Sequence, residues 1–221
     1  MHLLDAEARL LGVLIEKQLT TPDAYPLSGN ALRAGANQKS NREPQVDYSE
    51  PEVLVCVGGL VEKGLADRLP AGRNSRVERW EHRAADKLSV STPELAVLAE
   101  LLLRGPQAPG ALRQRASRMH DIPALSDLHP ILDRLLAKRL VRRLAPGSGS
   151  RSERFACTLT EHLESATERP ESQLPETQLP ATPSPRTAPG SPATSPEQSL
   201  EQRVRELELR VQELESRLPR N

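Results

Sequence analysis

Residues 60–69 of the chain read LVEKGLADRL, and residues 135–144 read LLAKRLVRRL. The two stretches align without a gap, and the match continues to one aromatic residue in each copy, Trp80 and Phe155. Each copy has the pattern of a helix end, a strand, a turn rich in Gly, Ser and Asn, and a return strand, which predicts two copies of one small domain. The matched positions are Lys63 with Lys138, Gly72 with Gly147, Ser75 with Ser150, Arg76 with Arg151, Glu78 with Glu153, and Arg79 with Arg154.

Segments with apolar residues at helical spacing precede the hairpin in both copies. The first copy is longer by roughly a dozen residues between its first helix and its hairpin, and the polar segment Asn37–Pro44 is the expected place of these extra residues. The predicted helices are 5–19, 28–36 and one that begins at the capping box of residues 49–52 in the first copy, and 91–104, 109–119 and 126–138 in the second; the predicted hairpins are 65–82 and 140–157.

Three helices followed by a two-stranded hairpin make a winged helix, in which the third helix usually reads DNA and the hairpin forms the wing. The sequence therefore predicts a mainly α fold with small β-hairpins (α+β), built from two tandem winged-helix domains at residues 1–88 and 89–165. Residues 166–196 are rich in Pro, Ser and Thr and have almost nothing to bury, which predicts a disordered linker.

Residues 197–219 carry a heptad pattern that is typical of a coiled-coil helix. In a parallel pair, Arg203 and Arg210 would face Glu208 and Glu215, so we expect a homodimer through this helix. The alternative is a single solvated amphipathic helix, because about three heptads are marginal for stability. The residues predicted to form the dimer seam are Leu200, Val204, Leu207, Val211, Leu214 and Leu218.

Composition and charge restrict the class of protein. The 221 residues are 37% hydrophobic, which suits one or two modest cores and not a large enzyme-type core. The formal net charge is zero, yet the second copy is basic and only that copy has the electrostatic character of a polyanion binder. Cys56 and Cys157 lie at unrelated points of the two copies, which favours reduced thiols. Without a leader segment or a membrane-spanning run, we expect a cytoplasmic protein with no membrane partner.

Five short motifs are distinctive. Residues 16–18 read EKQ, residues 25–28 read YPLS and residues 37–44 read NQKSNREP. Together with LLLRG at residues 101–105 and GALRQRA at residues 110–116, they resemble the YceH family of uncharacterised bacterial proteins over residues 3–157. The resemblance implies a tandem winged-helix fold, and it implies no activity, ligand or functional residue.

Residue types that serve catalysis are present but scattered. The five histidines have no Cys or carboxylate at metal-ligand spacing, and no phosphate-binding loop or Ser-His-Asp order is visible. We therefore expect a protein that is not an enzyme and that uses no metal or cofactor. The histidines are His2, His82, His120, His129 and His162.

Double-stranded DNA is the partner that the predicted fold and the basic second copy favour, because arginines of a wing neutralise phosphates and release counterions. Three carboxylates argue against DNA binding, because they lie in the first turn of the helices expected to read DNA. They are Glu50 and Glu52 in the first copy and Asp127 in the second. The candidate nucleic-acid-binding residues are Asn37, Lys39, Asn41, Arg42, Arg73, Arg76, Arg79, Arg113, Arg115, Arg118, Arg151 and Arg154.

Two alternatives stay open at this point. The hairpin arginines could form cross-strand ion pairs that recur only because the fold is duplicated, and the Asn37–Pro44 segment could hold an irregular turn by side-chain hydrogen bonds. The competing function is a protein-protein adaptor that uses the tandem winged helices and the coiled coil without binding DNA.

Overall fold

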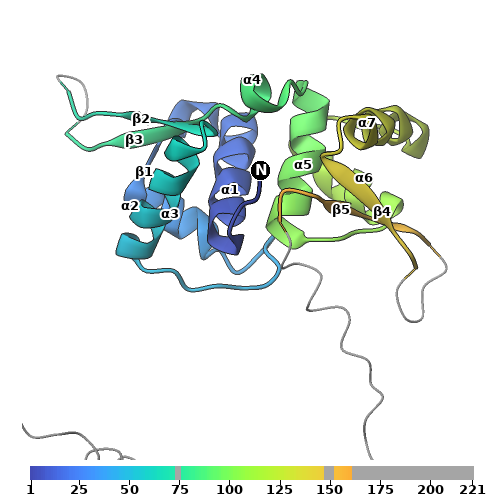
Figure 1. Cartoon of the computed structure of the whole chain (residues 1–221), viewed down its shortest axis with the longest axis horizontal. Helices are drawn as coiled ribbons and strands as arrows, with labels where there is room; N and C mark the ends of the chain where they lie inside the picture. Colours follow the sequence, from blue (N-terminus) through green and yellow to red (C-terminus); the bar gives the residue numbers. More distant parts are fainter. Residues whose placement is uncertain (73–75, 147–151, 161–221) are drawn as a thin grey trace, which may run out of the picture. The chain divides into compact units, whose positions relative to one another are not determined.

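The computed structural model describes residues 1–72, 76–146 and 152–160. Within them the chain is a mixed α/β fold with seven α-helices, one short 3-10 helix and two small antiparallel sheets (Figure 1). The predicted linker and the predicted coiled-coil helix lie outside the described residues. The helices are α1 Asp5–Thr20, η1 Pro22–Ala24, α2 Gly29–Ala36, α3 Glu50–Glu62, α4 Ala84–Leu88, α5 Thr92–Arg104, α6 Pro109–Ala116 and α7 Leu125–Ala137, and the strands are β1 Leu27–Ser28, β2 Ala66–Leu69, β3 Arg79–His82, β4 Val141–Leu144 and β5 Arg154–Cys157.

The internal repeat is visible in the element boundaries. α7 begins 75 residues after α3, and β4 and β5 begin 75 residues after β2 and β3. The strand register repeats as well, since Ala66 lies opposite His82 and Val141 lies opposite Cys157. This is the offset at which LVEKGLADRL matches LLAKRLVRRL, so the element order predicted for the two copies is confirmed.

The sequence predicted that the extra residues of the first copy lie in Asn37–Pro44, but they are divided between two places. α5 begins 87 residues after α1, whereas α6 begins 80 residues after α2. Seven of the extra residues therefore lie before α2, where α1 has 16 residues against 13 in α5 and where η1 has been added. The other five lie in the connection between α2 and α3, which contains Asn37–Pro44.

Local sequence starts the long helices in the predicted way. Ser49 and Ser91 precede α3 and α5, and the carboxylates of Glu52 and Glu94 accept the backbone N–H of these serines at 2.7 Å in each case. A proline occupies the first turn of both helices, where the missing N–H costs nothing. Both predicted capping boxes are confirmed.

Besides η1, two elements have no counterpart in the prediction. β1 adds a third strand to the first sheet, pairing with β3 through Leu27 opposite Trp80. A two-residue strand is too short to show an alternating pattern, so the sequence did not indicate it. The short helix α4 connects the first hairpin to α5 and is followed by Ser89, whose φ of 52° is left-handed.

The core is shared by the two copies. α1 and α5 pack side by side (Figure 1), and at Gly12 an added Cβ would lie 2.9 Å from Cγ of Leu103. Both helices are buried almost all round, as expected for helices at the centre of a fold. All described residues belong to one compact unit, so the division at residues 88 and 89 is a division between sequence copies within that unit.

Candidate functional site

The repeated lysine, Lys63 and Lys138, has a structural partner in each copy. Lys63 Nζ lies 2.5 Å from the buried carboxylate of Glu7, and Lys138 Nζ lies 3.0 Å from that of Glu94. Burial alone would raise the pKa of Glu94, but hydrogen bonds from Ser91 and Lys138 outweigh it and lower the pKa. The pair joins the start of the first helix to the end of the third in both copies, so its recurrence reflects the fold and not a ligand.

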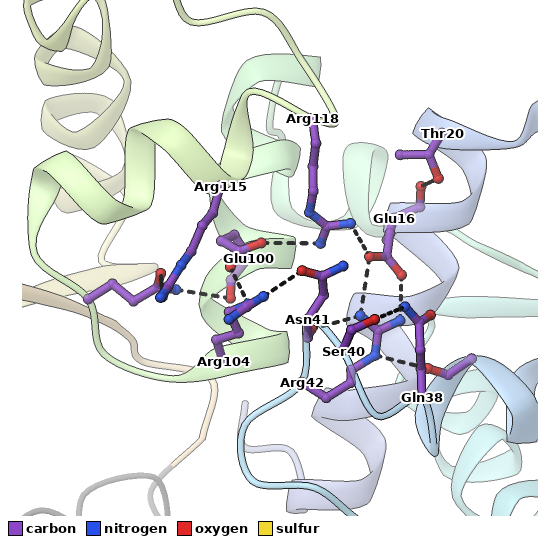
Figure 2. Close-up of polar contacts among 12 residues, drawn as sticks. Glu16, Thr20, Gln38, Ser40, Asn41, Arg42, Glu100, Arg104, Arg115 and Arg118 are labelled. Atoms are coloured by element: carbon purple, nitrogen blue, oxygen red, sulfur yellow. Dashed lines mark hydrogen bonds and ion pairs between the residues drawn. The ribbon is translucent and has the colours of Figure 1, made fainter.

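The contact between the copies contains a polar cluster (Figure 2). Glu16 on α1 and Glu100 on α5 have side chains that are 2% and 0% exposed. Arg42, itself 0% exposed, donates to both carboxylate oxygens of Glu16 at 3.2 and 2.5 Å. Arg118 donates to Glu16 and also to Glu100, the latter at 3.2 Å, and so joins the first copy to the second. Burial alone would raise the pKa of Glu16, but hydrogen bonds and charge from Arg42 and Arg118 outweigh it and lower the pKa.

The segment Asn37–Pro44 braces the second copy. Asn41 Oδ1 accepts a hydrogen bond from Arg104 at 2.5 Å, and the backbone N–H of Glu43 donates to the carbonyl of Leu103 at 2.9 Å. Figure 1 shows the connection between α2 and α3 crossing to the end of α5. Arg42 was expected on a DNA-contacting surface, but its burial against Glu16 makes it inaccessible to phosphate.

The same segment also holds its own turn. The side chain of Asn37 accepts the N–H of Tyr48 at 2.8 Å and donates to the carbonyl of Tyr48 at 2.8 Å. This reciprocal pair of hydrogen bonds takes the place of backbone–backbone hydrogen bonds across the loop. Asn37 and Asn41 therefore serve the structural alternative that the sequence left open, whereas Lys39 is exposed.

The three arginines of the α6 region all have partners inside the fold. Arg113 donates to the carbonyls of Ile122 and Pro123, both at 3.0 Å, and Arg115 donates to the side chain of Gln107 at 2.6 Å. With Arg118 bonded to two carboxylates, none of the three projects as an uncommitted side chain. All three were predicted to contact phosphate, and this stays a prediction; each of them also bonds to a neighbouring loop or helix.

The hairpin arginines divide into paired and exposed residues. Glu78 pairs across the strands with Arg68, and its counterpart Glu153 lies 3.9 Å from Arg143, the counterpart of Arg68. Cross-strand ion pairs thus recur in both copies, although not with the arginines predicted. Arg79 donates to the carbonyl of Pro26 at 2.7 Å, Arg154 is half-buried, Arg76 is exposed, and Arg73 and Arg151 lie outside the described residues.

Trp80 and Phe155 are 5% and 2% exposed, which confirms that the repeated aromatic residue packs beneath the hairpin.

The outward face of α3 is apolar. Leu54 is 41% exposed and Val55 is 75% exposed, and no heavy atom lies within 4 Å of the place where Gly58 would carry a Cβ. Exposed carboxylates flank this strip, at Glu50 near the start of the helix and Glu62 at its end. The corresponding positions of α7 are His129, Pro130 and Asp133, so the apolar strip belongs to the first copy alone.

A buried group around His82 was missed by the sequence reading. Its Nδ1 accepts the N–H of Ala84 at 3.2 Å, so Nε2 carries the hydrogen and donates to Gln18 at 2.5 Å. The hydroxyl of Tyr25 accepts the N–H of His82 at 2.6 Å. Burial and, to a smaller extent, the charge of Arg83 lower the pKa of His82 to about 4. The only sequence signal was that Gln18 and Tyr25 fall within the distinctive motifs.

Over the part of the chain that the structure describes, no three His, Cys, Asp or Glu side chains gather as metal ligands. Over the same part, no helix is both long and apolar enough to cross a membrane.

Comparison with known proteins finds close relatives. The model of a family described as "Protein of unknown function, DUF480" matches residues 3–168. A UPF0502 protein of Geotalea daltonii is 46% identical over 167 residues, which cover 75% of this chain and 76% of the relative. A UPF0502 protein of Geotalea uraniireducens is 47% identical over 169 residues, covering 76% of each chain, and one of Shewanella amazonensis is 44% identical over 166 residues, covering 72% and 79%. These matches leave the YceH name a prediction.

Proposed function

We propose that this chain, which belongs to the DUF480 family of bacterial proteins of unknown function, is an adaptor that binds another protein through α3 of the first of two tandem winged-helix repeats. The third helix of a winged helix usually meets DNA. Here the solvent-facing part of that helix presents Leu54 and Val55, and this single observation carries the proposal. Exposed apolar side chains grouped on one helix are typical of a surface that a partner covers.

Charge favours a protein partner over DNA at this surface. Glu50, Glu52 and Glu62 are exposed along α3, and their carboxylates would repel phosphates in a groove. The same carboxylates would attract lysines or arginines that flank an apolar strip on a partner helix, as in helix-in-groove recognition. The open space at Gly58 allows such a helix to approach closely. The partner we propose is therefore a basic amphipathic helix.

The proposal can be tested with a synthetic amphipathic helix that has leucines on one face and lysines on the other. We expect it to bind the full chain and to bind Val55→Ser at least about tenfold more weakly, because the variant loses apolar contact area worth more than about 1.4 kcal/mol. The matched control is Leu125→Ser, which changes a 41% exposed apolar helix residue in the second copy. Equal binding by all three proteins would overturn the proposal.

DNA binding is the second candidate, and one observation favours it. Arg142 and Arg143 are exposed on β4, the wing strand of the basic second copy. Duplex DNA should be titrated at two salt concentrations with the wild type and with Arg142→Glu/Arg143→Glu. Steeply salt-dependent binding that the double variant loses would favour DNA, whereas no retention at low salt would leave the adaptor function ahead.

A further inference from the structure

Positive charge exceeds negative charge where the two copies meet (Figure 2). Arg42, Arg104 and Arg118 pair with two carboxylates, and the charge of Arg115 also acts on Arg104. Four guanidinium groups against two carboxylates leave a surplus of two positive charges within this group. Glu16 is fully used, because Arg42 and Arg118 both donate to it. We refer to these residues as the arginine cluster: Arg42, Arg104, Arg115 and Arg118 with Glu16 and Glu100.

The surplus is concentrated on the side chains that solvent can reach. Arg104 and Arg118 are 21% and 29% exposed, whereas Arg42 is fully enclosed. Arg104 Nε lies 3.1 Å from Glu100 Oε1, yet neither atom makes a hydrogen bond within the described residues. Arg115 donates to the neutral amide of Gln107, which supplies no compensating charge. The unbonded Arg104 Nε is itself buried, so the partly exposed side of the cluster retains positive charge, on Arg104 and Arg118.

The arginines also act on one another. Burial lowers the pKa of Arg104, Glu100 opposes this effect, and the charges of Arg115, Arg118 and Arg42 lower the pKa further. The charges of three other arginines thus disfavour the charge on Arg104. A bound anion would relieve this repulsion, because like charges in a partly desolvated site are costly unless they are compensated.

We propose that Arg104, Arg115 and Arg118 form a binding site for the phosphoryl group of a small molecule. Planar guanidinium groups match the oxygens of phosphate with paired hydrogen bonds. The surplus of two charges equals that of a phosphoryl dianion, whereas a carboxylate or a phosphodiester would neutralise only one. Arg104 ends α5, Arg115 lies in α6 and Arg118 lies two residues after α6. Arg104 and Arg118 have defined bonds to the first copy, so the site is positioned before the ligand arrives. The site is independent of the apolar strip on α3.

The test is thermal unfolding of the full chain in low millimolar sodium phosphate, with sodium chloride and sodium acetate at matched ionic strength as references. We expect phosphate alone to raise the Tm along a saturating curve. Arg115→Gln should weaken this response at least about tenfold, since it removes one charge-assisted contact. The matched control is Arg33→Gln, which removes an exposed positive charge on α2, outside the cluster, and should respond like the wild type.

The outcomes separate a site from a general salt effect. Phosphate stabilises many proteins by exclusion from their surface, but that effect does not saturate and would persist in Arg115→Gln. A response of this kind, or equal shifts in phosphate and chloride, would overturn the proposal. If Arg115→Gln does not fold, isothermal calorimetry of the wild type with phosphate and with the monoester glycerol phosphate decides the question. Heat and saturation with either would support the site and distinguish free phosphate from a phosphorylated metabolite, and no heat with both would overturn it.

Discussion

Arg118 of the second copy donates a hydrogen bond to the buried carboxylate of Glu16 in the first copy, across 102 positions of sequence. Because Arg42 approaches the same carboxylate from the inserted loop, one glutamate orders three segments of the chain at once. The Asn37–Pro44 segment, which contains residues predicted to contact DNA, therefore holds the two copies together.

Replacing Glu16 tests this role. In Glu16→Gln, Arg42 is left as a buried cation without a compensating charge, and we expect the free energy of unfolding to fall by about 3–5 kcal/mol in urea titrations. Glu78→Gln is the control, because it breaks an exposed ion pair with Arg68 and should change stability little. If both variants lost a similar free energy of unfolding, the buried ion pairs of Glu16 would contribute no more to stability than an exposed ion pair.

The two matched lysines should differ in importance. Among the described residues, Lys63→Met leaves Glu7 with the backbone N–H of Leu4 alone, whereas after Lys138→Met the carboxylate of Glu94 still has Ser91 and, at 3.4 Å, Arg134. We expect Lys63→Met to cost about 3 kcal/mol and Lys138→Met less than that, as measured by chemical denaturation. The reverse order would contradict the partner sets described here.

Stability should depend on pH through His82. Its pKa is about 4 in the folded chain and 6.5 in the unfolded chain, so below pH 6.5 the unfolded state takes up a proton that the folded state does not. The free energy of unfolding should therefore fall by about 3 kcal/mol as the pH drops from 6.5 to 4. His82→Gln should flatten this interval in denaturation curves recorded at several pH values.

Glu16 adds a second, lower interval. Its pKa in the folded chain lies below the ordinary 4.5, so its contribution to stability is complete above that value and is lost as the pH falls through the folded pKa. In Glu16→Gln the fall in stability below pH 4.5 should be smaller, whereas the interval due to His82 should remain. A variant that loses both intervals would indicate that the two groups are coupled.

The predicted coiled coil can be tested without a structure of that segment. Changing Leu207 and Leu214 to polar residues should convert the proposed homodimer to a monomer, because both are predicted to lie in the apolar seam. Sedimentation equilibrium of the full chain measures the mass directly. An unchanged mass would contradict dimerisation through residues 197–219.

Repetition made the third helices and hairpins predictable. LVEKGLADRL and LLAKRLVRRL occur at an offset of 75 residues, and every boundary from α3 to β3 recurs at that offset. The six predicted helices are present with ends within three residues of the prediction. Periodicity and capping chemistry are local, so a single sequence contains enough information to identify these elements.

The candidate site was less predictable because its contacts are distant in sequence. Nothing near Arg42 indicates that Glu16 will enclose it, and nothing near Arg118 indicates that it will cross to α1. Counting arginines identified the basic copy correctly, yet most of the predicted phosphate contacts turned out to have partners within the fold. The apolar strip on α3 had a readable signal, since Leu54 and Val55 interrupt the polar side of an amphipathic helix.

The close approach of α1 and α5 at Gly12 means that neither half of the duplication is self-sufficient. If the chain were divided in the short connection between α4 and α5, each fragment would expose to solvent the apolar surface of α1 or α5 that the other helix covers. Such fragments should be insoluble or unfolded when made separately and should reassemble when made together. We therefore expect each copy of this duplicated fold to need the other in order to fold.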